Sequence, residues 1–413
     1  MTKRIVVTGI GASTPLGGTA PESWKNLLAG VSGASSLEYD WVEETQLPVT
    51  FAAQAQVRPD TVLPRPVAKR LDPSSQFAMV AAMEAWEDAG TPDVAPERLG
   101  VDFATGIGGV WTLLDAWDTL REKGPRRVLP MTVPMLMPNA AAGNLSLHFH
   151  ARAYARTVAS ACASSTESIV NAVEHLRAGL ADVVIAGGTE SAIHPITIAS
   201  FASMQALSRR NDSPETASRP GAVDRDGFVM GEGAAALILE TEEHARARGA
   251  KIYAAVVGGG VTADSYHITA NDPEGAGAAR AVRLALESAG ATPDQLTHVN
   301  AHLTSTPVGD PNEFTALHDV FGDRIREIPV SGTKASTGHL LGGTGALEAV
   351  FTVLALRDRI APPTINMTEQ DPEVPFRLST EPVALDDGPQ LAISNSFGFG
   401  GHNAVAAFAS VDD

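Results

Sequence analysis

Three stretches in the first half of the sequence recur, in the same order, in the second half. The matching pairs are residues 78–93 with 278–294, 158–164 with 330–336, and 184–188 with 392–396. In the first pair, the Ala-Gly steps that end a helical pattern lie 200 residues apart, at 89–90 and 289–290. Ordered self-similarity of this kind indicates a duplicated structural unit. We therefore expect two similar halves, residues 1–250 and 251–413.

Each half is predicted to alternate strands with helices. Short apolar runs predict strands at residues 4–10, 100–105, 182–188 and 297–301, with residues 251–257 as the second copy of the first strand. Such alternation is typical of mostly parallel sheets covered by helices. In these architectures the functional site lies where the carboxyl ends of strands meet. Residues 30–65 are irregular and are interpreted as a surface excursion.

Bulk properties exclude several classes of function. A net charge of −18 disfavours global attraction to nucleic acid or to an anionic membrane. The single cysteine excludes an internal disulfide and a cysteine-cluster metal site, and we expect no metal. Without a signal-peptide pattern or a run of 18 apolar residues, a cytoplasmic protein is expected. The glycines at 9–11 and 106–109 lack dinucleotide-binding spacing and are interpreted as strand-end turns.

The only cysteine, Cys162, lies between an apolar, strand-like run and a helical pattern from about Ser164 to Leu176. Free backbone N–H groups at a helix start favour a thiolate over a thiol. This position is typical of an activated nucleophile. The stretch alone fits equally well a buried cysteine that acts as a small hydrophobic residue.

Polar side chains follow the predicted strands of the second half. His302 follows one strand, and Lys334 and His339 follow another. Together with Cys162, two histidines suit thioester chemistry, because a thiolate attacks a carbonyl and imidazole N–H groups stabilise the oxyanion that develops.

Six motifs together resemble the β-ketoacyl-acyl carrier protein synthases of the type II elongating kind. They are ASACASS at 159–165, VNAHLTSTPVGD at 299–310, GTKASTGHLLGGTGALE at 332–348, SNSFGFGGHN at 394–403, RDGFVMGEGA at 225–234 and MLMPN at 135–139. The resemblance covers essentially the whole chain. It implies an α/β, thiolase-like fold whose duplicated halves form five layers, α-β-α-β-α. It also implies condensation of an acyl chain with malonyl-acyl carrier protein, with loss of carbon dioxide, in fatty acid or polyketide-type biosynthesis.

The resemblance implies catalytic roles for five residues. Cys162 would carry the acyl chain as a thioester, and His302 and His339 would hold the malonyl thioester carbonyl. The backbone N–H groups of Cys162 and Phe399 would form the oxyanion hole, with Phe399 also gating the acyl pocket. Lys334 would act electrostatically, paired with Glu348.

Further residues are assigned by the same resemblance to substrate binding, support and docking. Substrate binding falls to Ile107, Phe201, Thr304, Thr306, Phe397 and Gly398. Support falls to Glu348 and to Asp310, which would anchor the His302 loop. Docking falls to Lys69, Arg70, Arg209 and Arg210, because an acidic carrier protein needs a local positive patch on this acidic chain. No cofactor is expected beyond the phosphopantetheine of the carrier protein. A homodimer is implied, with a heterodimer of related subunits as the alternative.

Several positions depart from the family pattern close to the catalytic residues, among them Ala335 and Ser336, which replace bulkier residues. Leu303 stands where the family has glycine, and Ser165 replaces the glycine of Cys-Ala-Ser-Gly. If the backbone at 303 needed a positive φ, leucine would cost about 1 kcal/mol or more. The alternatives are therefore an ordinary elongating synthase, a specialised secondary-metabolite or inhibitor-resistant synthase, and a weakened partner subunit. A thiolase, which would need a second catalytic cysteine, and a non-enzymatic binding module fit less well.

Overall fold

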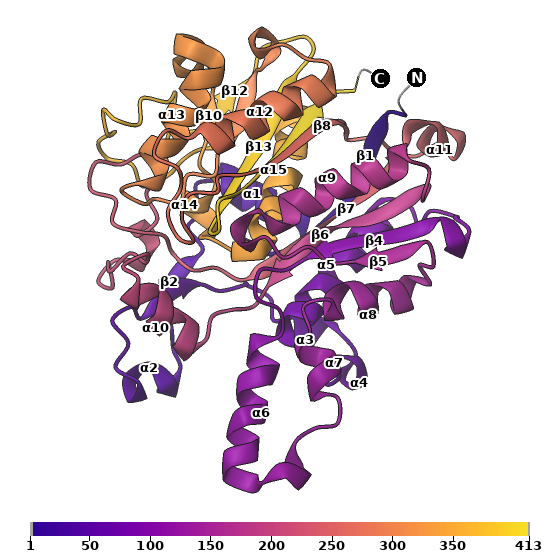
Figure 1. The fold of residues 1–413 in the computed structure, drawn as a ribbon, viewed down its shortest axis with the longest axis vertical. Coiled ribbons are helices and arrows are strands. Elements are labelled where there is room, and N and C mark those ends of the chain that lie inside the picture. Colours follow the sequence, from indigo (N-terminus) through magenta and orange to yellow (C-terminus); the bar gives the residue numbers. More distant parts are fainter. Residues whose placement is uncertain (1–2, 412–413) are drawn as a thin grey trace.

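The computed structural model describes residues 3–411, in which ten strands form one mixed sheet (Figure 1). The strands of the first half are β1 (Ile5–Ser13), β4 (Leu99–Ala104), β5 (Tyr154–Arg156), β6 (Val183–Glu190) and β7 (Gly233–Thr241). Those of the second half are β8 (Ala254–Ala263), β9 (His298–Asn300), β10 (Val330–Ser331), β13 (Leu391–Gly398) and β14 (His402–Ala409).

The duplication predicted from the sequence is present in the topology. From the centre outward, the first half runs β1-β7-β6-β4-β5 and the second runs β8-β14-β13-β9-β10, which is the same order of equivalent strands. The halves join where Ile5–Val7 of β1 pair with Ala254–Val256 of β8. The second copy of the first strand is thus β8, which begins three residues after the predicted residue 251.

The prediction of mostly parallel sheets is wrong. Parallel pairing is confined to the outer strands, where β4 pairs with β5 and β6, and β9 pairs with β10 and β13. The central strands are antiparallel, since β7 and β14 run opposite to their neighbours. The repeats in the sequence did not reveal these two strands, and for this reason the prediction failed. A turn at residues 399–401 links β13 directly to β14, and so short a connection can join only antiparallel strands.

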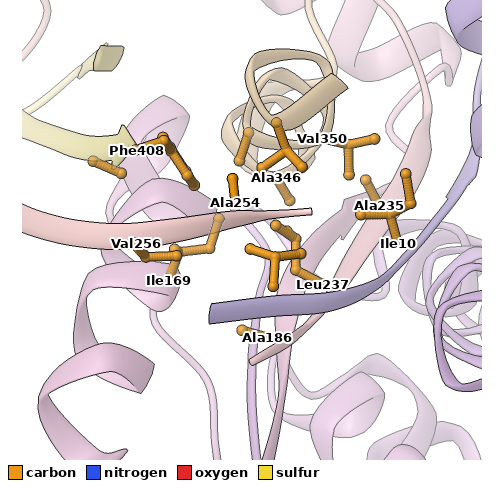
Figure 2. Packing of buried hydrophobic residues seen from close by; sticks show 14 of the residues in the cluster. Ile10, Ile169, Ala186, Ala235, Leu237, Ala254, Val256, Ala346, Val350 and Phe408 are labelled. Atoms are coloured by element: carbon orange, nitrogen blue, oxygen red, sulfur yellow. The ribbon is translucent and has the colours of Figure 1, made fainter. Parts of the chain in front are cut away.

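The two halves of this continuous sheet have helices between them and on their outer sides, which gives the five predicted layers (Figure 1). Helices α9 (Ser164–Arg177) and α15 (Thr344–Asp358) form the middle layer and contact strands of both halves. The outer helices are α5 (Pro73–Asp88) and α8 (Ala140–Phe149) on the first half, and α12 (Ala276–Ala289) with α13 (Gly309–Phe321) beside it on the second. Residues 344–356 of α15 are all buried, as expected for a helix that is covered on every side. Figure 2 shows Ala346 and Val350 of α15 close to Ala235 of β7, within the largest buried cluster.

Glycines in β1 and β8 let the outer helices approach closely. A Cβ at Gly9 or Gly11 would lie 2.2 or 2.1 Å from carbonyl oxygens of α5. A Cβ at Gly258 or Gly260 would meet α12 at the same two distances. The interpretation of Gly9 and Gly11 as turn glycines is therefore wrong, because both lie inside a strand and serve helix packing.

The remaining elements are short, apart from one projecting segment. Residues 110–137 contain α6 (Val110–Lys123) and α7 (Thr132–Leu136) and project from the body (Figure 1). The others are α1 (Ala20–Leu28), α2 (Asp40–Glu44), α3 (Pro59–Val62), α4 (Arg65–Ala68), α10 (Pro195–Ser203), α11 (Glu242–Ala247), α14 (Lys334–Thr337), β2 (Ala34–Ser36), β3 (Phe51–Ala53), β11 (Ile360–Ala361) and β12 (Val383–Ala384). Within 30–65, β3 is fully buried, so that stretch is only partly a surface excursion. Between residues 3 and 411, no helix is long and apolar enough to cross a membrane.

Candidate active site

Cys162 lies in a tight turn at the start of α9. The turn is a 3₁₀ segment, Ala161–Ala163, and the strand before it ends at Arg156, so the predicted strand leading directly into Cys162 is absent. Ala161 has a φ of 51°, which is unusual for a residue with a side chain. The end of β13 lies against this turn, and a Cβ at Gly398 would be 2.9 Å from the Cys162 nitrogen. This approach brings Phe399 next to the sulfur.

The backbone N–H groups of Phe399 and of Cys162 itself lie near the Cys162 sulfur and lower its pKa. Part of the side chain remains open to solvent, but protein atoms surround it. This burial raises the pKa of the thiol to about 11, against the Lys334 charge and the two N–H groups, which lower it. The prediction that the helix start would favour a thiolate is therefore wrong, because burial outweighs the favourable charges. The resting group is a thiol at neutral pH.

A raised thiol pKa predicts how Cys162 reacts with iodoacetamide. The rate should rise about tenfold per pH unit from pH 7 to 10, because only the thiolate reacts. A model thiol with a pKa near 8.5 should instead reach a plateau by about pH 9.5. Since the chain has one cysteine, the mass of the intact protein reports this reaction alone. A plateau at or below pH 8.5 would show that the sulfur is activated at rest.

His302 and His339 lie next to each other, and both lie near Lys334, as Cys162 does. Their ring centroids are 5.5 Å apart and the rings are nearly perpendicular, at 83°. Nδ1 of His302 and Nε2 of His339 have no hydrogen-bond partner among the described residues, although both atoms are buried. The other nitrogen of His339, Nδ1, lies 2.9 Å from the hydroxyl of Thr344. These two ring nitrogens are therefore available to bond a bound molecule.

Both imidazoles are neutral at physiological pH. Burial is the main cause that holds the pKa of each histidine well below 6.5, and the Lys334 ammonium adds to it. Lys334 itself is buried and donates to Glu348 Oε1 at 2.5 Å. Burial raises the pKa of Glu348 to about 7, although Lys334 opposes this shift. The structure therefore places Lys334 near Cys162, His302, His339 and Glu348.

Glu313 on α13 fixes the His302 loop and was missed in the sequence. Its carboxylate accepts the backbone N–H groups of His302 at 2.9 Å and Leu303 at 2.8 Å, and the Asn395 side chain at 3.0 Å. Asp310, three residues earlier in α13, accepts the Thr306 N–H at 3.3 Å, in the place predicted for an anchor. The i, i+3 spacing of the two acids was the available signal.

Glu190 at the end of β6 is a second residue that sequence reasoning missed. Its buried carboxylate accepts hydrogen bonds from the Thr105 hydroxyl at 2.8 Å and from the backbone N–H groups of Gly106, Ile107 and Gly342 at 2.8 to 3.2 Å. It thereby joins the loop after β4 to the turn that follows His339. The side chain of Ile107 on this loop is 40% exposed.

Aromatic rings connect the remaining predicted binding residues to the histidines. The ring centroid of Phe201 lies 6.4 Å from that of Phe399 and 5.3 Å from that of Phe228. The ring centroids of Phe228 and His339 are 5.4 Å apart. Phe397 lies 6.0 Å from the His302 ring. The hydroxyls of Thr304 and Thr306, beyond His302, are 3.1 Å apart.

The predicted docking residues differ in how they are held. Lys69, Arg70 and Arg209 are exposed, on α4's end and in the loop after α10. Arg210 is half-buried and donates to Asp224 at 2.6 Å, so its charge is partly neutralised. Lys69 and Arg70 therefore offer a more available positive charge than Arg210.

Leu303 and Ser165, which depart from the family pattern, are both accommodated by their buried surroundings. Leu303 is 1% exposed and packs in the core of the second half. The positive φ of its loop, 66°, falls on Ser305 rather than on Leu303. Ser165 accepts the Ala346 N–H at 2.9 Å and fits because Gly188, with no Cβ, lies against it. Neither residue strains the backbone of the site.

Replacing Leu303 should cost stability without improving activity. The change Leu303→Ala removes a buried side chain from the core and is expected to lower the free energy of unfolding by about 2–5 kcal/mol. Urea unfolding would measure this loss, and condensation assays on the same sample would measure activity. A gain in activity with unchanged stability would show that the leucine obstructs the site.

Two family models together match most of the chain. The N-terminal domain of β-ketoacyl synthases matches residues 2–245, and the C-terminal domain matches residues 253–368. The chain belongs to the β-ketoacyl synthase family. Among similar members, the 3-oxoacyl-[acyl-carrier-protein] synthase 2 of Staphylococcus aureus is 44% identical over 409 residues, 98% of each chain. The enzyme of the same description from Mycobacterium bovis is 42% identical over 408 residues, 98% of this chain and 96% of its own.

Solved structures of other family members have the same fold. One solved structure is a type II PKS acyl-carrier protein in complex with its ketosynthase bound to the hexaketide. A chain of this complex superposes with a TM-score of 0.92, at 31% identity and full coverage of both chains. A β-ketoacyl synthase from Burkholderia phymatum gives a TM-score of 0.90 at 36% identity, with 99% of this chain and all of the other covered. The thiolase-like fold and membership in a condensing-enzyme family are thus established for this chain.

Proposed function

We propose that this chain condenses an acyl chain held on Cys162 with malonyl-acyl carrier protein, giving β-ketoacyl-acyl carrier protein and carbon dioxide. One observation supports this most strongly. One thiol and a pair of neutral histidines all lie near Lys334, and within residues 3–411 each histidine has a buried ring nitrogen without a hydrogen-bond partner. This arrangement suits two successive reactions of thioesters.

In the first reaction, the Cys162 sulfur attacks the thioester carbonyl of the acyl donor. The N–H groups of Cys162 and Phe399 stabilise the oxyanion. The carrier thiol then leaves with the proton that Cys162 gives up, and the acyl chain remains on Cys162. Because burial raises the pKa of the thiol, the sulfur loses its proton during the transfer and not before it.

In the second reaction, the ring N–H groups of His302 and His339 hold the thioester carbonyl of the malonyl donor. The carbon–carbon bond to the carboxylate breaks, carbon dioxide leaves, and the electron pair forms an enolate that these N–H groups stabilise. The enolate carbon attacks the acyl carbonyl on Cys162. The thiolate of Cys162 leaves and takes up a proton from solvent, so the cycle closes without a cofactor other than the phosphopantetheine arm.

The substrate and partner assignments from the sequence extend this proposal. Ile107, Phe201, Phe397 and Gly398 line the acyl side, Thr304 and Thr306 bind the pantetheine arm, and Phe399 gates the entrance. Lys69, Arg70, Arg209 and Arg210 contact the carrier protein. The chain works as a homodimer in the cytoplasm. The buried, unstrained Leu303 argues for a working synthase over a weakened partner subunit.

A two-step assay tests the proposal. The protein is incubated with acyl carrier protein that bears a radiolabelled acyl group, and malonyl-acyl carrier protein is then added. We expect label on Cys162 first and on a β-ketoacyl product afterwards. Label on Cys162 without product would identify an acyl-accepting partner subunit, and no label at all would overturn the proposal.

A further inference from the structure

Arg225 lies buried between three chain segments beside the site. Its side chain is 3% exposed. It comes from the loop before β7, and its guanidinium donates to the carbonyls of Thr306 at 2.9 Å and Pro307 at 3.1 Å. It also donates to Asp371 at 2.6 Å, and Asp310 lies 3.5 Å away. One side chain thus fixes residues 306–307 against two carboxylates.

The segment that Arg225 holds is conformationally demanding. Ser305, between the two threonines, has a φ of 66°, a region that side chains disfavour. The backbone N–H of Gly227, two residues after Arg225, donates to the Ser305 carbonyl at 3.0 Å. The backbone N–H of Arg219 donates to the Ser305 hydroxyl at 3.0 Å. The loop before β7 therefore imposes the shape of residues 304–307.

This shape decides where the Thr304 and Thr306 hydroxyls lie. They are 3.1 Å apart, and the Thr306 hydroxyl also accepts the Gly309 N–H at 3.1 Å. The carbonyls of Thr306 and Pro307 both accept hydrogen bonds from the Arg225 guanidinium. Rotation of the backbone at these two residues would therefore break both hydrogen bonds. A lysine could keep a charge near Asp371 but could not reproduce the planar set of donors.

We propose that Arg225 is a positioning residue that presents the Thr304 and Thr306 hydroxyls to the amide-containing arm of the thioester donor. This inference rests on the proposed function, since it assumes that an arm binds these hydroxyls. Arg225 touches no substrate and acts through the backbone of residues 306–307. It therefore determines how well a donor with an arm is used, and not the reactivity of Cys162.

The test compares two donors on the variant Arg225→Lys. One is an octanoyl thioester of pantetheine, and the other is the octanoyl ethyl thioester, which has no amide groups. Acylation of Cys162 is followed by the mass of the intact protein. We expect kcat/KM to fall about tenfold or more for the pantetheine donor and less than twofold for the ethyl donor. An equal loss with both donors, or no loss with either, would overturn the inference.

A double-mutant cycle with Thr306→Val separates positioning from general destabilisation. If Arg225 acts through Thr306, the loss from Arg225→Lys with the pantetheine donor should shrink at least threefold in the Thr306→Val background. Additive losses would contradict the inference. Arg248→Lys is the matched control, because Arg248 pairs with buried Glu240 at the far end of β7 and should show no difference between donors. Wild-type protein that no pantetheine donor acylates would overturn the proposed function itself.

Discussion

Cys162→Ser is expected to abolish acylation of the protein, with a loss of at least ~10³-fold. A serine hydroxyl is a far weaker acid and nucleophile than a thiol, and within residues 3–411 no imidazole is hydrogen-bonded to position 162 to activate it. The two backbone N–H groups would remain, but they stabilise an oxyanion that no longer forms at a useful rate. Intact-protein mass after incubation with an acyl donor measures the effect directly.

Cys162→Ala separates the two proposed reactions. It should also lose acylation, yet it should still release carbon dioxide from malonyl-acyl carrier protein, because His302 and His339 are untouched. Ser165→Gly, three residues further along, is the matched control and should be acylated normally. Acylation of the Cys162→Ala protein would place the nucleophile elsewhere, and loss of carbon dioxide release would make the thiol part of the decarboxylation step.

The duplication could be predicted because each half packs a helix closely against an equivalent strand. The Gly-x-Gly pairs of β1 and β8 meet α5 and α12 at matching distances, so similar sequences were required at both places. Strand direction was harder to predict. β14 pairs with β13 through a turn that contains Phe399, and the sequence assigned this residue to an oxyanion hole and a gate but not to a turn between strands. Local patterns show that a strand exists but not which neighbour it pairs with.

Some residues of the candidate site could likewise be predicted from the sequence, and others could not. His302, Lys334 and His339 could be predicted because each follows a strand within a distinctive motif. Glu313 and Glu190 act on backbone N–H groups of other segments, and such contacts leave little trace in a linear pattern. The sign of the Cys162 pKa shift was predicted wrongly for a related reason. The helix start is visible in the sequence, whereas the number of atoms packed around the sulfur is not.

His339→Ala is expected to reduce carbon dioxide release from malonyl-acyl carrier protein by about 10²–10³-fold, the effect of removing one oxyanion donor. Acylation of Cys162 should change little, since the oxyanion of that step is bound by backbone N–H groups. His302→Ala should show the same division between the two steps. Loss of acylation in both histidine variants would instead mean that the imidazoles activate the thiol.

Thr344→Val tests how His339 presents its proton. For Nε2 to donate to a substrate carbonyl, a neutral imidazole must carry its hydrogen there, and Nδ1 must then accept the Thr344 hydroxyl at 2.9 Å. Without that hydroxyl the competing tautomer is no longer disfavoured, so carbon dioxide release should fall by up to about tenfold, the effect of one hydrogen bond. Thr352→Val, two turns further along α15, removes a hydroxyl that bonds only within the helix and should leave the rate unchanged. Equal rates in the Thr344→Val variant and the wild type would mean that the substrate itself selects the tautomer.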